Sequence, residues 1–136
     1  MQRCVSLLLA GLGMSPEPEI RVEDGVTVVA LGPAFAQIDE RIVDQIRESL
    51  DLDPYLAQQP LLVIDLSYTR FFGSSFIEIL FGLWTKLNGI PGGRFALSGV
   101  TPYCREVLKV THLDTLWGMY GTSKEAVEAL RSAPVA

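Results

Sequence analysis

Two adjacent serines, Ser74 and Ser75, are the residues of this chain whose type and spacing best fit a chemical role. Ser75 and Glu78 have the S-x-x-E spacing of a capping box, so we expect a helix to begin at Ser75 and Ser75→Asp to be mild for stability. Ser74 then lies on the surface, at the positive end of the helix dipole. A hydroxyl in that position can receive a phosphate, or it can simply precede a helix.

Residues for other kinds of chemistry are scarce in this sequence. A Ser-His-Asp triad would need the single histidine, His112, and a lone histidine in a turn is more often structural. The sequence has no cluster of His, Cys and carboxylate residues with the spacing of metal ligands. The two cysteines, Cys4 and Cys104, form no disulfide framework, which fits a reducing cytoplasm. We therefore expect a non-enzymatic protein without metal or cofactor.

The composition indicates one globular domain. The 136 residues are 49% hydrophobic and 20% charged, with a net charge of −5, and such a chain can bury a core of its own. The negative charge argues against a general nucleic-acid-binding protein, whose affinity would depend on Lys and Arg. The apolar run Val5 to Leu12 is too short to span a bilayer. We expect residues 1–18 to be a loosely ordered extension.

The elements that must position the serines follow from the apolar pattern. The turn Glu23-Asp24-Gly25 predicts a hairpin because glycine readily adopts a positive φ. Charged residues of the next helix, Asp39 and Glu40 among them, are expected on its solvated face. Residues 51–60 are expected to form a loop. We expect strands at 20–22, 26–31, 61–64, 94–98 and 116–120, and helices at 36–50, 75–87, 102–110 with Thr101 as its cap, and 123–131.

This alternation of strands and helices predicts the α/β class. We expect a single mixed β-sheet of four to five strands, covered by about four α-helices. The domain should occupy residues 19–131, with 132–136 as a C-terminal tail. The apolar run Leu61 to Ile64 should be a central strand buried on both faces, and Asp65 should lie at its end.

The stretch from Leu61 to Leu87 resembles the central signature of the STAS family, the domain shared by anti-sigma factor antagonists and sulphate transporters. The family pattern is a buried strand ending in Asp-Leu-Ser, a short loop, and then Asp-Ser-Ser-Gly or Asp-Ser-Thr-Gly at the start of a helix. Asp65-Leu66-Ser67 matches the first part, and Gly73-Ser74-Ser75-Phe76 lies where the second part is expected. The second motif is degraded, because glycine replaces its aspartate and phenylalanine replaces its glycine.

The resemblance implies that Ser74 is the phosphoacceptor of an anti-sigma factor antagonist. The implied partner is an anti-sigma factor serine kinase of the histidine-kinase-like ATPase fold, in the bacterial cytoplasm. The unmodified antagonist would bind this kinase and so free a sigma factor for transcription. The missing aspartate keeps an alternative open, in which the chain is a STAS subunit that binds a transporter or sensory assembly constitutively. Whether the chain forms a homodimer is also left open.

The helix expected at 75–87 is apolar on two sides. Phe76, Leu80, Leu83 and Leu87 have the spacing of a core stripe, and Ile77, Phe81 and Trp84 form a second stripe. Because the start of this helix contacts the partner in the STAS family, we expect the second side to dock to a partner. We also expect Ile64, Leu80 and Leu83 to be nearly fully buried. The predicted partner-binding residues are Gly73, Ser74, Phe76, Ile77, Phe81 and Trp84.

Overall fold

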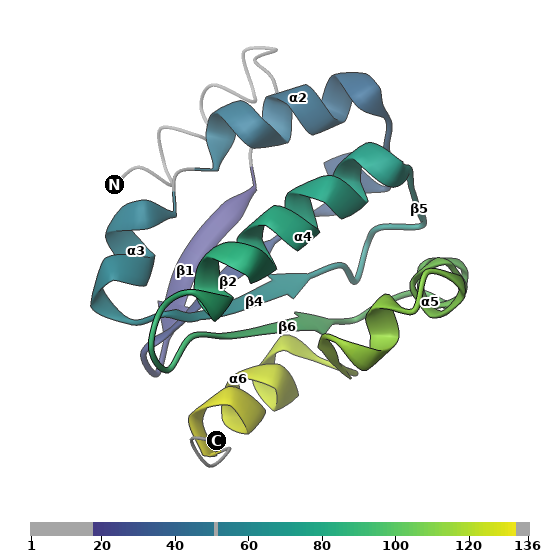
Figure 1. The fold of residues 1–136 in the computed structure, drawn as a ribbon. Coiled ribbons are helices and arrows are strands. Elements are labelled where there is room, and N and C mark those ends of the chain that lie inside the picture. The colour runs from purple at the N-terminus through teal and green to yellow at the C-terminus, as the bar shows by residue number, and fades with distance from the viewer. Residues whose placement is uncertain (1–17, 51, 133–136) are drawn as a thin grey trace.

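The computed structural model describes residues 18–50 and 52–132, which form an α/β structure around a five-stranded sheet (Figure 1). The strand order is β1-β2-β4-β6-β7, and only the β1–β2 pair of this sheet is antiparallel. The predicted α/β class and mixed sheet are confirmed. The strands are β1 (Glu19–Glu23), β2 (Val26–Ala30), β4 (Leu61–Asp65), β6 (Arg94–Ser98) and β7 (Gly118–Tyr120).

The first two strands form the predicted hairpin. Its two turn residues, Asp24 and Gly25, have φ angles of 52° and 83°. Two successive residues with positive φ are typical of the type I′ turn, whose twist matches that of the flanking strands. The local sequence is therefore sufficient to set the pairing of β1 with β2.

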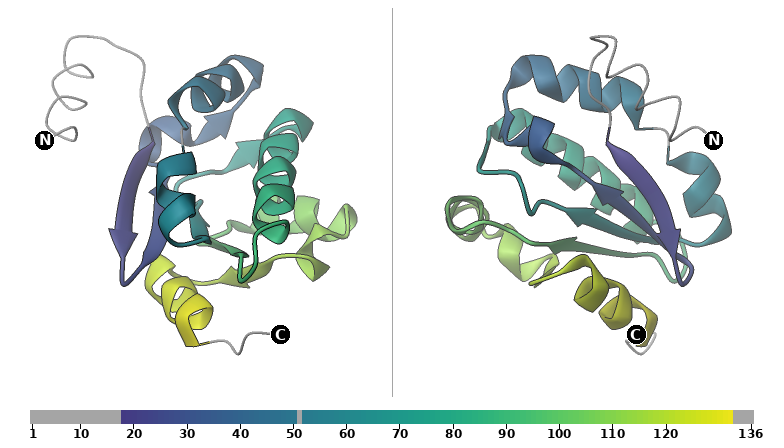
Figure 2. Two further views of the ribbon diagram at one scale, coloured as in Figure 1. Left: turned by 60° about the vertical axis from the view of Figure 1, so that its left-hand side comes forward. Right: turned by 180° about the vertical axis from the view of Figure 1, so that it is seen from behind.

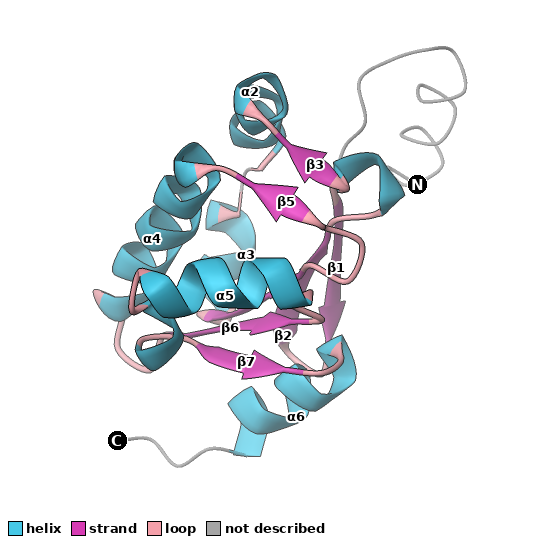
Figure 3. Ribbon diagram, turned by 90° about the vertical axis from the view of Figure 1, so that its right-hand side faces the viewer, coloured by secondary structure: helices cyan, strands magenta, loops and turns pink. Residues whose placement is uncertain are grey.

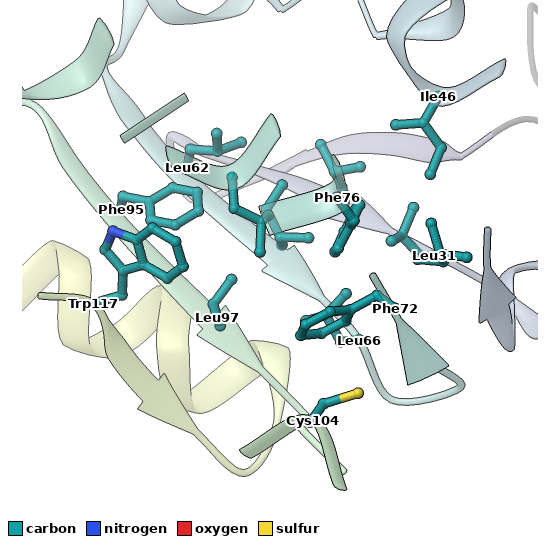
Figure 4. Close-up of a cluster of buried hydrophobic side chains, with 14 of the residues drawn as sticks. Leu31, Ile46, Leu62, Leu66, Phe72, Phe76, Phe95, Leu97, Cys104 and Trp117 are labelled. Carbon is teal, nitrogen blue, oxygen red and sulfur yellow. The ribbon is translucent and has the colours of Figure 1, made fainter. Parts of the chain in front are cut away.

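Helices cover the two faces of the main sheet unequally. The large buried cluster on one face includes residues from four helices, whereas the cluster on the other face is completed by α6 alone (Figure 2). Alternate residues of the central strands supply the two clusters. Leu62, which is labelled in Figure 4, and Ile64 contribute to the larger one. Val63 and Ala96 pack under α6. The helices are α2 (Glu40–Ser49), α3 (Asp53–Gln58), α4 (Ser74–Asn88), α5 (Pro102–Val110) and α6 (Ser123–Ser132).

The start of α2 and the segment 51–60 differ from the prediction. α2 begins at Glu40 rather than near residue 36, because Pro33–Phe35 forms a 3-10 turn and Asp39 is the N-cap, whose Oδ1 accepts the Ile42 N–H at 3.0 Å. The predicted loop at 51–60 contains α3. This short helix has a proline in its first turn, where the missing N–H costs no helical hydrogen bond.

A second, two-stranded sheet was not predicted. β3 (Gln37–Ile38) pairs in parallel with β5 (Phe71–Phe72) (Figure 3). Strands of two residues are too short to show an alternating pattern. β3 comes just before α2 and β5 just before α4, so this small sheet places the starts of the two helices side by side.

The predicted core residues have two different outcomes. Ile64 and Leu80 are each 1% exposed, which confirms that α4 turns its Leu80 side toward the sheet. Leu83 is only partly buried, so its prediction is wrong. The fully buried side of α4 is formed by Phe76, Leu80 and Leu87, and Leu83 packs against this cluster at its margin.

Candidate functional site

Ser74 is the first residue of α4, and its side chain is exposed. Gly73 is the N-cap in extended backbone geometry, and its carbonyl accepts the N–H groups of Phe76 and Ile77 at 3.2 and 3.4 Å. The hydroxyl of Ser74 is thus presented at the positive end of a fifteen-residue helix. Another protein can reach it without any rearrangement of the core.

Ser75 is not the helix cap, which corrects the predicted capping box. The helix starts one residue earlier, so Ser75 lies inside the first turn and Glu78 in the second. The Ser75 Oγ instead donates a hydrogen bond of 2.5 Å to the Glu40 Oε1 of α2. A tertiary contact has therefore replaced the local one that the S-x-x-E spacing suggested.

The predicted partner-binding residues separate into two groups. Phe76 is 2% exposed and belongs to the core, so its side chain is not available to a partner, and that prediction is corrected. Ser74, Ile77 and Phe81 have the i, i+3, i+7 spacing of one helix face. Phe81 is 44% exposed and its ring centroid lies 5.3 Å from that of the half-buried Trp84. The structure thus exposes Ser74 and Phe81 on α4, whereas Ile77 and Trp84 are half-buried and pack against the core cluster.

The Asp65-Leu66-Ser67 segment has a structural role at the end of β4. Asp65 Oδ1 accepts hydrogen bonds from Ser67 Oγ and from the buried Ser98 Oγ, both at 2.8 Å. Gly99, at φ 63°, follows closely, and a Cβ there would lie 2.2 Å from Ser67 Oγ. These contacts join the carboxyl ends of β4 and β6 and set the direction of the loop that leads to Ser74.

Thr69 anchors the loop that follows β4 to two other segments, the turn at Phe35 and the start of α5. Its buried hydroxyl donates to the Phe35 carbonyl at 3.0 Å. Its own carbonyl accepts from Thr101 Oγ1 at 2.8 Å and from Cys104 Sγ at 3.6 Å. Burial raises the pKa of the Cys104 thiol, which therefore stays protonated at neutral pH and acts as a packing residue. Because Thr69 is hydrogen-bonded to these two segments, the loop holds Ser74 in a defined position.

Sequence reasoning missed three residues near this site. Glu40 was placed on a solvated face, yet it contacts Ser75. Phe71 and Tyr103 are 43% and 52% exposed, and their ring centroids are 5.7 Å apart. Phe71 precedes Ser74 by three residues in the chain. A two-residue strand gives no periodic signal for the first ring, and the second lies on the solvent side of α5, away from the apolar stripe of that helix.

Away from Ser74, the described part of the chain has a hollow at the far end of α4 and no candidate metal site. A hollow of about 650 Å³ lies at the opposite end of α4, lined by the glycine-rich turn at 89–93, Arg94 and Tyr120. Trp84 is the one predicted site residue that borders it. Within residues 18–50 and 52–132, no group of three or more His, Cys, Asp or Glu is placed to hold a metal ion. Nor is any helix in those ranges long and apolar enough to cross a membrane.

Comparison with known families found a match to most of the chain. A family model described as the STAS domain matches residues 17–126. This chain belongs to the STAS family. Among solved structures, it is similar to an anti-sigma-factor antagonist (STAS) domain protein from Planctomyces limnophilus, with 39% identity over 84% of this chain and 97% of that protein, at a TM-score of 0.72.

Two further solved structures extend the comparison of this STAS chain. An anti-sigma factor antagonist from Mycobacterium paratuberculosis is 30% identical over 85% of this chain and 93% of that protein, with a TM-score of 0.70. The Bacillus cell fate determinant SpoIIAA, in its phosphorylated form, is 23% identical over 84% of this chain and 99% of that protein, with a TM-score of 0.64. The second likeness concerns the fold alone. Comparison with curated proteins found no match.

Proposed function

We propose that this STAS protein is an anti-sigma factor antagonist, a non-enzymatic binding switch that is controlled by phosphorylation of Ser74. The observation that carries the proposal is the exposed hydroxyl of Ser74 at the start of α4, in a chain similar to anti-sigma factor antagonists. The partner would be an anti-sigma factor serine kinase of the histidine-kinase-like ATPase fold, in a bacterial cytoplasm.

The reaction would be an ordinary phosphoryl transfer. Ser74 Oγ forms a bond to the γ-phosphorus of ATP held by the kinase, and the bond from this phosphorus to the bridging oxygen of ADP breaks. The hydroxyl proton passes to a base of the kinase. The product carries about −1.5 to −2 additional charge at neutral pH.

The proposed partner surface is the outer side of α4 together with its N-terminal loop. It includes Gly73, Ser74, Ile77, Phe81 and Trp84. The exposed pair Phe71 and Tyr103 extends it next to Ser74. A phosphate in this surface would lose water on binding and would face the carboxylates of Glu40 and Glu78, so the unmodified protein should be the binding form.

Substitutions at Ser74 test the switch. Ser74→Ala should bind the kinase like the wild type, whereas Ser74→Asp should weaken binding at least tenfold, because each tenfold loss needs only about 1.4 kcal/mol and like-charge contacts can cost more. Affinity is measured with the kinase captured from the source organism and identified by mass spectrometry. Gln58→Asp is the control, since Gln58 is exposed at the end of α3, outside the proposed partner surface, and receives the same charge.

The mass of the intact protein provides a second test. After incubation with the kinase and ATP, the wild type should gain one phosphate and Ser74→Ala none. Gly73 in place of the motif aspartate favours the alternative, a STAS subunit that binds constitutively. That alternative holds if the wild type gains no phosphate, Ser74→Asp binds like the wild type, and a transporter ATPase is captured instead of a kinase.

A further inference from the structure

α4 begins without an acidic group of its own. Within this fully described helix, the N-cap Gly73 makes no side-chain hydrogen bond and the first turn contains no acidic residue. The start of a helix carries a partial positive charge and several N–H groups without helical partners. Negative groups near this position stabilise a helix. The first turn of α4 thus has an electrostatic requirement that its own residues do not meet.

A carboxylate reaches this position from another element. The β3–β5 pair aligns Gln37 with Phe71 and Ile38 with Phe72. Continued by two residues, the same register brings Glu40 level with Ser74. Glu40 is the first residue of α2, and its Oε1 accepts the hydrogen bond of 2.5 Å from Ser75 Oγ. Figure 3 shows the two strands of the small sheet side by side, with β3 leading into α2 and β5 leading into α4.

We propose that Glu40 is a positioning residue of the switch. It supplies, from α2, the carboxylate that the STAS motif has at the position of Gly73, and a phosphate on Ser74 displaces it from the start of α4. The first part of this inference concerns only the folded protein. The second part rests on the proposed function, because it needs a phosphate on Ser74.

The displacement follows from charge. The phosphate on Ser74 and the Glu40 carboxylate are both negative, and both lie at the start of α4. The phosphate is attached to Ser74, and the carboxylate accepts the hydrogen bond of the next residue, Ser75. The phosphate carries more charge and is covalently attached there, so it takes the place of the Glu40 carboxylate, which lies against the Ser75 hydroxyl at the start of α4. The Ser75–Glu40 hydrogen bond is then lost. α2 thus loses a contact with α4 at the corner that borders the partner surface.

A double-mutant cycle tests the first part without any partner. A Cβ at Gly73 would meet no described atom within 4 Å, and the φ of −99° suits any residue, so Gly73→Asp introduces no strain. Glu40→Gln should lower the thermal unfolding midpoint by about 2–4 °C, and Gly73→Asp should raise it more in the Glu40→Gln background than in the wild type. Additive effects of the two changes would overturn the inference.

Glu78→Gln is the matched control for this cycle. It removes the same charge from an exposed position of α4 that lies beyond the first turn. Its effect on the midpoint should be smaller than that of Glu40→Gln and additive with Gly73→Asp. If Glu78→Gln couples to Gly73→Asp as strongly as Glu40→Gln does, the role is not specific to Glu40 and the inference is wrong.

Hydrogen exchange tests the second part. In protein made with phosphoserine at position 74, amides in the first turns of α2, which loses its contact with Ser75, should exchange about two to five times faster than in the unmodified protein, the range of a surface charge interaction. The same modification in Glu40→Gln should change these rates less. Equal changes in both proteins would exclude displacement of Glu40. A loss of kinase affinity on phosphorylation with equal exchange would leave the proposed function standing and reject only this inference.

Discussion

The two serines at the start of α4 have different surroundings, although they are neighbours in the chain. The Ser74 hydroxyl is exposed at the first position of the helix, and the Ser75 hydroxyl is bound to Glu40. Ser74 is thus accessible for modification, whereas the Ser75 hydroxyl links α4 to α2. Ser75→Asp, which a capping residue would tolerate, would bring two carboxylates together here.

Alanine substitutions should separate the two roles. Ser75→Ala removes the donor to a carboxylate and should lower the free energy of unfolding by about 1 kcal/mol, less than for a buried charged hydrogen bond because the pair is exposed to solvent. Ser74→Ala should change it by less than about 0.5 kcal/mol. Urea unfolding of both variants measures the difference. Equal effects would mean that the Ser75–Glu40 bond contributes nothing in solution.

Leu80 and Phe81 form a second informative pair. Leu80 is 1% exposed, whereas Phe81, the next residue of the same helix, is 44% exposed. Leu80→Ala should therefore cost about 2–5 kcal/mol, the usual penalty for a deleted core leucine. Phe81→Ala should cost less than half as much, while weakening the proposed partner contact. Denaturant unfolding of both variants measures the two penalties. A larger penalty at Phe81 would show that Phe81, and not Leu80, faces the sheet.

At the scale of elements, the start of α2 depends on one side chain. Asp39 Oδ1 accepts the Ile42 N–H, so Asp39→Ala should lower the free energy of unfolding by about 0.5–2 kcal/mol. Asp44→Ala is the control, since its ion pair with Arg47 on the same helix is exposed and should contribute less than about 0.5 kcal/mol. Denaturant unfolding of both variants measures the costs. If they were the same, the cap would have no energetic role.

The long elements were predictable from the sequence because their burial pattern is local. β4, β6 and α5 lie within one residue of their predicted bounds. β3 and β5 were missed, since two residues show no period, and α3 was taken for a loop. Burial of Phe76 was ambiguous for another reason. A helix that is apolar on two sides does not indicate which side the sheet will cover.

The candidate site was predictable only in part, for a related reason. Exposure of Ser74 follows from its place at the beginning of a helix, which the sequence indicates. The approach of Glu40 depends on the pairing of β3 with β5, two segments more than thirty residues apart in the chain. No local pattern contains that information. The spacing of Ser75 and Glu78 therefore predicted a local cap, whereas in the tertiary structure the Ser75 hydroxyl binds Glu40.

At the scale of the whole molecule, Cys104 can report on opening of the domain. Its thiol is fully buried, and burial raises its pKa. In a Cys4→Ser background, which removes a thiol outside the described residues, iodoacetamide should react with Cys104 only at denaturant concentrations that unfold the protein. Because the folded pKa is above the unfolded one, this thiol's contribution to stability is present at neutral pH and is lost as the pH rises through the folded value.

Two outcomes would contradict this prediction. Rapid alkylation in the absence of denaturant would mean that α5 opens locally. Unchanged stability between neutral pH and the alkaline range, relative to a Cys104→Ala control, would mean that the thiol is not buried in solution. Mass spectrometry of the alkylated protein measures the first, and urea midpoints across the pH range measure the second.

The parallel arrangement of the central strands also bears on how the chain assembles. The β1–β2 hairpin joins close neighbours, but each parallel pair of the main sheet unites segments separated by an intervening helix. Closing such long loops costs entropy before the strand contacts compensate for it, so folding should be slower than for a helical bundle of the same size. On the ribosome, β4 gains its second neighbour only when β6 has been made. The apolar residues on the face of β4 that packs under α6 stay uncovered until α6 has been made, and a nascent chain interrupted before that point would be prone to aggregate.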